Sequence, residues 1–193
     1  GPTTHDHLGT YIFHMKTKKT YTTYIPGFNG FLSPRFGIQA NRIQISSWRN
    51  PTLINYDSNS IDSVYSYDFF DKSKSFKAIN GENNLIKNFE NDTLKDINFF
   101  RLNTFINSFS NLKVERFLSD SFKIPLSNPY KKIIIYSKEN TDSVIFHKIT
   151  NKIDLDTNSY KIKRKYVIKN NKEISIVQDY VFNKVLINID DFK

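Results

Sequence analysis

The chain has 193 residues, of which 38% are hydrophobic and 15% aromatic, enough to build a core and to exclude disorder throughout. It contains no cysteine, so disulfide bonds, thiolate metal sites and a cysteine nucleophile are excluded. The formal net charge of +9 suits anionic partners, but solvated surface lysines are the simpler explanation for it.

The first half of the chain shows the period of two that is typical of half-buried strands. It predicts strands at residues 10–14, 21–25, 61–67 and 75–79. The last two frame a hairpin through residues 71–73, and Asn80-Gly81 predicts a turn after it.

Residues 92–110 change to a helical period, with apolar side chains on one broad face. Asp92 or Thr93 is a candidate N-cap, and Thr93 with Asp96 resembles a capping box. Strands are predicted to resume at 113–118, 132–136, 143–149, 160–168 and 173–178, with a less regular last strand at 179–187.

These elements predict an α+β fold with a mainly antiparallel twisted sheet. One principal helix, at about residues 92–110, packs on the sheet, and residues 26–51 form a long ordered loop. We expect residues 1–193 to form a single domain.

The 26–51 loop concentrates glycine, proline and arginine and holds the only tryptophan of the chain. Glycine and proline fix or free backbone torsions, and arginine supplies a planar fork of donors, so the loop is built to one shape. Its side chains either tie the loop onto the sheet or form a partner surface. The candidate partner-binding residues are Arg35, Phe36, Arg42, Trp48 and Arg49.

Residues 160–166 interleave basic and aromatic side chains. As a strand, this segment could hold phosphate groups or anionic lipid headgroups, which makes it an alternative anion-binding site. A half-buried strand with a solvated lysine face is the more common arrangement, and lysines also protect sheet edges from unwanted pairing. The candidate anion-binding residues are Lys161, Lys163, Arg164 and Lys165.

Two further groups contain residue types that are used in metal binding or catalysis. His5, Asp6 and His7 could donate to a metal ion, but no second cluster completes a ligand set, so no metal is expected. Asp154 and Asp156 alternate like a catalytic carboxylate pair, but the Asp-Thr-Asn-Ser that begins at Asp156 indicates a turn. No phosphate loop, nucleophile elbow or zincin helix is present, so no catalytic residue and no cofactor are expected.

Several short motifs resemble the family called domain of unknown function 4340, and more narrowly its members in Bacteroidota. The motifs are Gly1, Thr4, Asp6 and Gly9-Thr10-Tyr11, then Ile25-Pro26-Gly27-Phe28 with Gly30, Arg35-Phe36, Trp48-Arg49 with Thr52, Val177-Gln178 and Tyr180-Val181-Phe182. The resemblance implies that this chain is the C-terminal portion of a longer cell-envelope protein. It also implies a location on the periplasmic side, with an N-terminal membrane anchor upstream.

The leading functional prediction is a non-catalytic cell-envelope domain that binds another protein. The resemblance suggests that it is an accessory to envelope transport or assembly. Envelope proteins and, through the anchor, the membrane are the expected partners; nucleic acid and a small-molecule substrate are not expected. The alternatives are a basic module that binds anionic polymer or lipid headgroups, and an unrecognised hydrolase.

Overall fold

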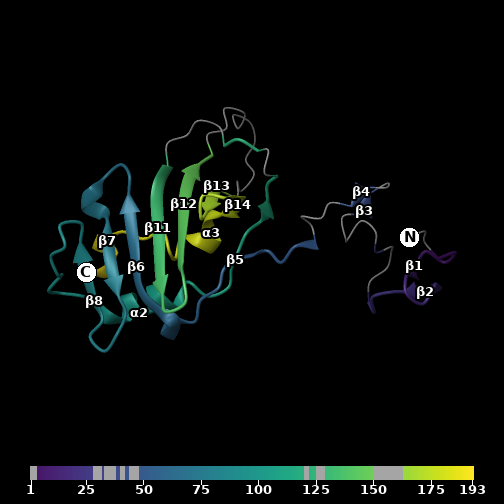
Figure 1. Ribbon diagram of the computed structural model, residues 1–193, viewed down its shortest axis with the longest axis horizontal. Coiled ribbons are helices and arrows are strands. Elements are labelled where there is room, and N and C mark those ends of the chain that lie inside the picture. The colour runs from purple at the N-terminus through teal and green to yellow at the C-terminus, as the bar shows by residue number, and fades with distance from the viewer. Residues whose placement is uncertain are drawn as a thin grey trace. The chain divides into compact units, whose positions relative to one another are not determined.

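The computed structural model describes residues 4–27, 32, 38–39, 42–43, 48–119, 122–124, 129–149 and 163–193. The chain forms two compact units, Gly1–Asn50 and Pro51–Lys193 (Figure 1). A single domain over the whole chain stays a prediction.

The first unit is organised around a hairpin of β1 (Thr10–His14) and β2 (Lys19–Thr23), with a second short pair of β3 (Ile38–Gln39) and β4 (Arg42–Ile43). The strand predicted at 10–14 is confirmed, and its partner lies two residues earlier than predicted. The predicted 26–51 loop lies mostly outside the described residues.

A closed turn precedes β1 and gives a physical role to the Thr4, Asp6 and Gly9 motif. The Thr4 hydroxyl donates to Asp6 over 2.6 Å, and the backbone N–H of Gly9 donates to the Thr4 hydroxyl over 2.8 Å. A Cβ atom on Gly9 would lie 3.2 Å from methyl groups of both Thr4 and Thr22, so a larger residue would push these side chains apart.

The second unit is built on one antiparallel sheet of eight strands in the order β10-β14-β13-β12-β11-β6-β7-β8. The α+β class, the mainly antiparallel sheet and the single principal helix are therefore confirmed. The strands are β6 (Ile61–Asp68), β7 (Phe76–Ile79), β8 (Leu85–Asn88), β10 (Arg116–Phe117), β11 (Pro129–Ser137), β12 (Thr141–Lys148), β13 (Arg164–Lys169) and β14 (Glu173–Gln178).

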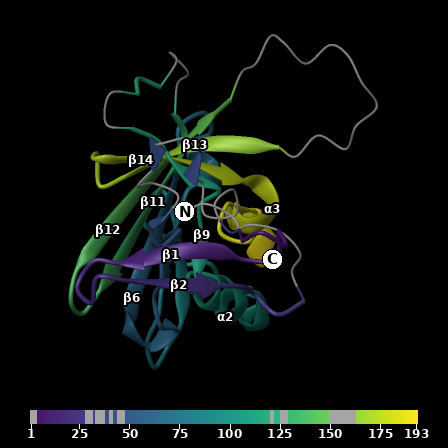
Figure 2. The ribbon, with the colours of Figure 1, turned by 90° about the vertical axis from the view of Figure 1, so that its right-hand side faces the viewer.

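Short elements complete the second unit. They are β5 (Thr52–Ile54), which pairs with β9 (Leu112–Lys113), the helices α2 (Phe99–Asn107) and α3 (Asp179–Phe182), and the 3-10 turns η2 (Ser58–Ser60), η3 (Lys72–Lys74) and η4 (Ile189–Phe192). Both views place α2 and α3 on the same side of the sheet (Figures 1 and 2). Phe76 of β7, Phe105 of α2 and Phe192 of η4 meet edge to face there, with ring centroids 4.9–5.6 Å apart.

The principal helix begins at Phe99, not at residue 92, so the predicted Thr93 cap is wrong. Asn98 is the N-cap, and its side chain accepts from the backbone N–H of Arg101 over 3.1 Å. The residues before Asn98 pair with β8 and so are not helical. The N–H of Leu94 donates to the carbonyl of Ile86 in β8, and Thr93 forms a β-bridge with Lys87. The chain returns along β8 and covers the exposed edge of the sheet.

The last predicted strand, 179–187, is also wrong, because the chain turns into α3 and then η4. The buried side chains here are Phe182, Val185, Ile189 and Phe192. They recur every three or four residues, which is the spacing of a helical face. Helical turns therefore bury these side chains, and no pairing with the sheet is needed. Strand β8 was not predicted, since its four residues contain only two apolar side chains.

Lys131 ties this C-terminal segment to the sheet. It points from β11 into the covered side, where its side chain is only 2% exposed. Its Nζ donates to the carbonyl of Ile187 and to Oδ1 of Asn188, each over 2.7 Å. Burial lowers the pKa of Lys131 to about 8, although the charges of Asp68 and Asp191 act against this shift.

We predict that Lys131 makes stability depend on pH in the alkaline range. An unperturbed lysine has a pKa of 10.5, so between about 8 and 10.5 the unfolded chain holds a proton that the folded chain has released. The free energy of unfolding should therefore rise with pH across this window. Because tyrosines with raised pKa values act oppositely near pH 10, we would compare the wild type with Lys131→Met by urea denaturation from about pH 7 to 9.5. An equal slope in the two proteins would contradict the prediction.

Candidate functional site

The outer face of the sheet, opposite α2 and α3, is the first candidate surface of the second unit. Alternation along the strands sends one set of residues inward, where they are buried, and the next set outward, where most are half-buried or exposed. The outward set on strands β6, β7, β8, β11 and β12 is Ser63, Tyr65, Tyr67, Lys77, Ile79, Leu85, Lys87, Lys132, Ile134, Tyr136, Thr141, Ser143, Ile145 and His147. Among these described positions there is no Asp or Glu.

Tyrosines and lysines alternate across the middle of this surface. Tyr65 lies opposite Lys77, and Tyr67 lies opposite Lys132 on the neighbouring strand. We call the set Tyr65, Tyr67, Lys77, Lys87, Lys132 and Tyr136 the tyrosine-lysine face. Phe69 and Phe89 extend it, with ring centroids 5.0 and 6.1 Å from that of Tyr67.

The lysines of this face have no carboxylate partner among the described residues. Lys77 and Lys87 stand directly opposite each other on β7 and β8. Like charges in such a pair repel and destabilise the sheet. The Nζ atom of Lys77 instead lies 5.5 Å from the ring centroid of Tyr136, within cation–π range. An anionic group placed between the two lysines would relieve the repulsion.

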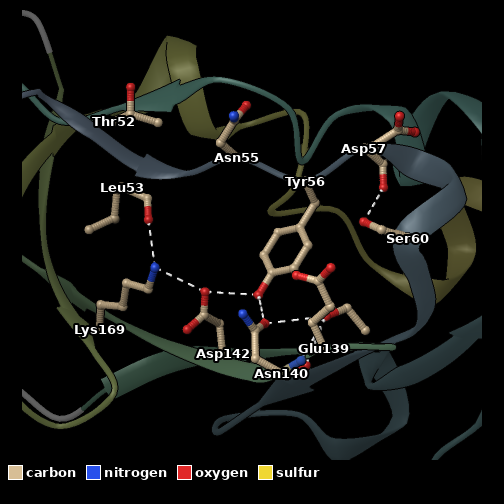
Figure 3. Close-up of a pocket in the computed structure, with 11 residues that line it drawn as sticks. Thr52, Leu53, Asn55, Tyr56, Asp57, Ser60, Glu139, Asn140, Asp142 and Lys169 are labelled. Atoms are coloured by element: carbon tan, nitrogen blue, oxygen red, sulfur yellow. Dashed lines mark hydrogen bonds and ion pairs between the residues drawn. The ribbon is translucent and has the colours of Figure 1, made fainter.

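A polar pocket is the second candidate, at the end of the sheet where the β11–β12 hairpin meets the β5–β6 connection. It has a volume of about 350 Å³. Figure 3 shows the side chain of Tyr56 reaching toward Asp142 and Asn140. The lining residues are Thr52, Leu53, Asn55, Tyr56, Asp57, Ser60, Ser137, Glu139, Asn140, Asp142 and Lys169.

A hydrogen-bond network fixes the floor of this pocket. The Tyr56 hydroxyl lies 2.6 Å from Oδ1 of Asn140 and 2.9 Å from Oδ2 of Asp142. Lys169 forms an ion pair of 2.9 Å with Asp142 and donates to the carbonyl of Leu53 over 2.9 Å. Asn170 donates to the other oxygen of Asp142 over 2.7 Å. Three segments distant in sequence are thereby held together (Figure 3).

The same network sets the charges. Burial raises the pKa of Asp142, but hydrogen bonds from Asn170, Lys169 and Tyr56 outweigh it and hold that pKa below its usual range. Burial and the neighbouring Asp142 carboxylate raise the pKa of Tyr56. Asp142 is thus ionised and Tyr56 protonated at neutral pH. Asp142 already accepts three hydrogen bonds, which suits an anchor better than a general base.

The loop residues predicted to bind a partner are only partly described. Trp48 is 54% exposed and Arg49 is exposed, as a partner surface requires. Arg42 lies in β4, while Arg35 and Phe36 lie outside the described residues. The partner-binding role of this set stays a prediction.

The predicted anion-binding strip is partly neutralised within the chain. Arg164 forms an ion pair of 2.6 Å with Glu115, and its hydrogen bond lowers the pKa of that carboxyl. Lys165 pairs with Asp179 of α3. Lys163 is exposed just before β13, and Lys161 lies outside the described residues. The free positive charge of this strip is smaller than the sequence suggests.

The two groups with metal-binding or catalytic residue types are not assembled into a site by the described part of the chain. Asp6 accepts from Thr4 and from the N–H of Leu8 within the first turn, and these bonds lower its pKa. Asp154 and Asp156 lie outside the described residues. No group of three or more His, Cys, Asp or Glu gathers at metal-binding distance in the ranges given above.

Comparisons with protein-family models, with curated proteins and with solved structures found no match to this chain. The resemblance to domain of unknown function 4340 therefore stays a prediction, as does the envelope location. None of the described helices combines the length and the hydropathy needed to cross a bilayer.

Both candidate sites were missed from the sequence. The outer face had a usable signal, because Tyr65 and Tyr67 alternate with buried residues in a predicted strand. The pocket had none: Tyr56, Asp142 and Lys169 come from three separate segments and are unremarkable in their local sequence.

We predict that Tyr56→Phe lowers the free energy of unfolding by about 1 kcal/mol, since Asp142 and Asn140 lose the hydroxyl whose single proton they share. Chemical denaturation measures this change. Tyr180→Phe is the matched control, because the Tyr180 side chain is 73% exposed. Equal losses in both variants would show that the network does not hold the pocket together.

Proposed function

We propose that this protein is a non-catalytic cell-envelope domain that binds an acidic protein partner through the tyrosine-lysine face. The observation that carries the proposal is a sheet face with aromatic and aliphatic side chains, three lysines without carboxylate partners and no acidic residue on its described positions in strands β6, β7, β8, β11 and β12. The envelope location rests on the sequence resemblance alone.

The chemistry of the face matches a protein partner in two ways. Lys77, Lys87 and Lys132 offer donors to carboxylates, and their half-buried stems lie along apolar surface. Ile134 lies opposite Tyr65 and Ile145 lies opposite Lys132, and both offer apolar area that a partner with apolar side chains would cover. Aromatic rings beside such area are typical of protein interfaces.

The ring faces argue against single-stranded nucleic acid as the partner. Base stacking needs flat, accessible aromatic faces. Here Lys77 lies over the ring of Tyr136, and Lys72 lies 5.6 Å from the ring centroid of Phe89. Tyr67 and Phe69 meet edge to face at 88°. The lysines and neighbouring rings thus occupy faces that bases would need.

The experiment is affinity capture by the full chain from an envelope extract of the source organism, followed by binding measurements with the purified partner. The variant Lys77→Glu/Lys87→Glu/Lys132→Glu should weaken binding by about tenfold or more, because each reversal replaces an attraction with a repulsion. Rising salt should weaken wild-type binding.

A matched control reverses three exposed lysines elsewhere, at Lys16, Lys138 and Lys172, and so has the same net charge as the triple variant. Equal loss in both variants would mean that net charge, not this face, drives capture. Recovery of lipid or polymer without a protein would overturn the proposal in favour of the anionic-polymer alternative.

The predicted loop surface is tested by the same measurement. If Trp48 and Arg49 contribute, the double variant Trp48→Ala/Arg49→Ala should bind the same partner more weakly than the wild type does. The control variant with reversed charges at Lys16, Lys138 and Lys172 should keep its affinity for that partner. Unchanged affinity in this double variant would limit the interface to the sheet.

A further inference from the structure

We propose that the polar pocket of Figure 3 binds a neutral, hydroxyl-rich ligand of about the size of one sugar ring. This inference is independent of the proposed partner surface. The pocket lies at the end of the sheet, whereas the tyrosine-lysine face spans the middle of its outer side.

Size and composition limit the ligand. A volume of about 350 Å³ is at the small end of ligand pockets, which span roughly 300–1,000 Å³. Pockets for apolar ligands are lined mainly by hydrophobic residues. Here all lining residues except Leu53 and Tyr56 carry hydrophilic side chains, so a ligand must exchange its water contacts for many polar contacts.

The pocket offers both donors and acceptors, as a polyol requires. Asn55 accepts from the N–H of Asn111 over 3.0 Å through Oδ1, which leaves its Nδ2 donor available. Likewise, Oδ1 of Asn140 accepts from the Tyr56 hydroxyl, which leaves the Nδ2 donor of Asn140 available. Asp57 accepts from the N–H of Asn59 through Oδ1, which leaves Oδ2 as an acceptor for a hydroxyl.

The donors and acceptors are held in place before any ligand arrives. Tyr56, Asp142 and Lys169 fix the floor, and Asn140 is bound to the Tyr56 hydroxyl and to Ser137 at 3.2 Å. Preorganisation of this kind reduces the conformational entropy that binding would cost. The ring of Tyr56 supplies an apolar wall against which the carbon skeleton of a sugar can lie.

Charge decides against anionic ligands. Three carboxylates line the pocket, at Asp57, Glu139 and Asp142, against the single cation Lys169. Lys169 is already paired with Asp142, so the remaining charge is negative. Phosphates and carboxylates would be repelled. Hydroxyl groups can donate to Asp57 and Glu139 in charge-assisted hydrogen bonds without bringing a charge of their own.

The test is titration of the full chain, followed by ligand-observed NMR and calorimetry. The probes are the methyl glycosides of glucose, mannose and galactose, together with N-acetylglucosamine. Glucosamine and putrescine serve as amine comparators. At least one neutral sugar should bind saturably, with an affinity that does not change up to about 0.5 M salt.

Variants at Glu139 locate the site and identify the chemistry. Glu139 is exposed, so Glu139→Ala should fold, and it should weaken sugar binding by about tenfold. Glu139→Gln keeps an acceptor oxygen and should lose less. Glu82→Ala, an exposed glutamate in the β7–β8 connection, is the matched control and should bind like the wild type.

Three results would overturn the proposal: no saturable binding of any neutral sugar, binding of the amines alone, or equal sugar affinity in wild type and Glu139→Ala. The sugar-site proposal and the partner-surface proposal can be disproved independently of each other. The triple lysine variant should keep sugar binding, and Glu139→Ala should keep the protein partner.

Discussion

The packing of three phenylalanine rings determines which face of the sheet in the second unit is covered and which is open to a partner. Phe76, Phe105 and Phe192 come from β7, α2 and η4 and meet edge to face, and each is at most 1% exposed. The described helices α2 and α3 lie on that side of the sheet (Figure 2). The apolar side chains of the inner face are buried against them and against the C-terminal turn. The outer face is left to residues that tolerate water, and its composition is therefore open to selection for binding.

Strand β11 shows how little net charge says about function. Lys131 and Lys132 are adjacent in sequence but point to opposite sides of the sheet. Lys131 is buried and satisfied by backbone and amide oxygens of the C-terminal segment. Lys132 lies opposite Tyr67 on the outer face without a carboxylate partner among the described residues. One lysine holds the fold together, and the other is available to a partner.

The sequence predicted those parts of the fold whose signal is local. Runs rich in β-branched and aromatic residues identified β1, β6, β7 and β14, and β7 buries every second side chain as strict alternation requires. The start of α2 could not be found this way, since Thr93 and Leu94 bond to β8, and only the paired strand reveals that competition. The candidate sites depend even more on tertiary structure. Cross-strand register brings Lys77, Lys87 and Lys132 onto one face, and a network across three segments builds the pocket.

The strongest physical argument that the outer face is a binding surface is that some basic side chains have carboxylate partners within the chain, whereas the lysines of the outer face have none among the described residues. Arg164, Lys165 and Lys169 each have a carboxylate within the chain. Lys77 and Lys87 have no such partner in the described part of the chain and stand opposite each other, an arrangement that costs stability in the isolated protein. A glutamate at either position would remove the repulsion and form an attractive cross-strand pair. Retaining two lysines instead makes sense if a partner supplies the missing negative charge, so the energetic defect of the free sheet becomes a source of specificity in the complex.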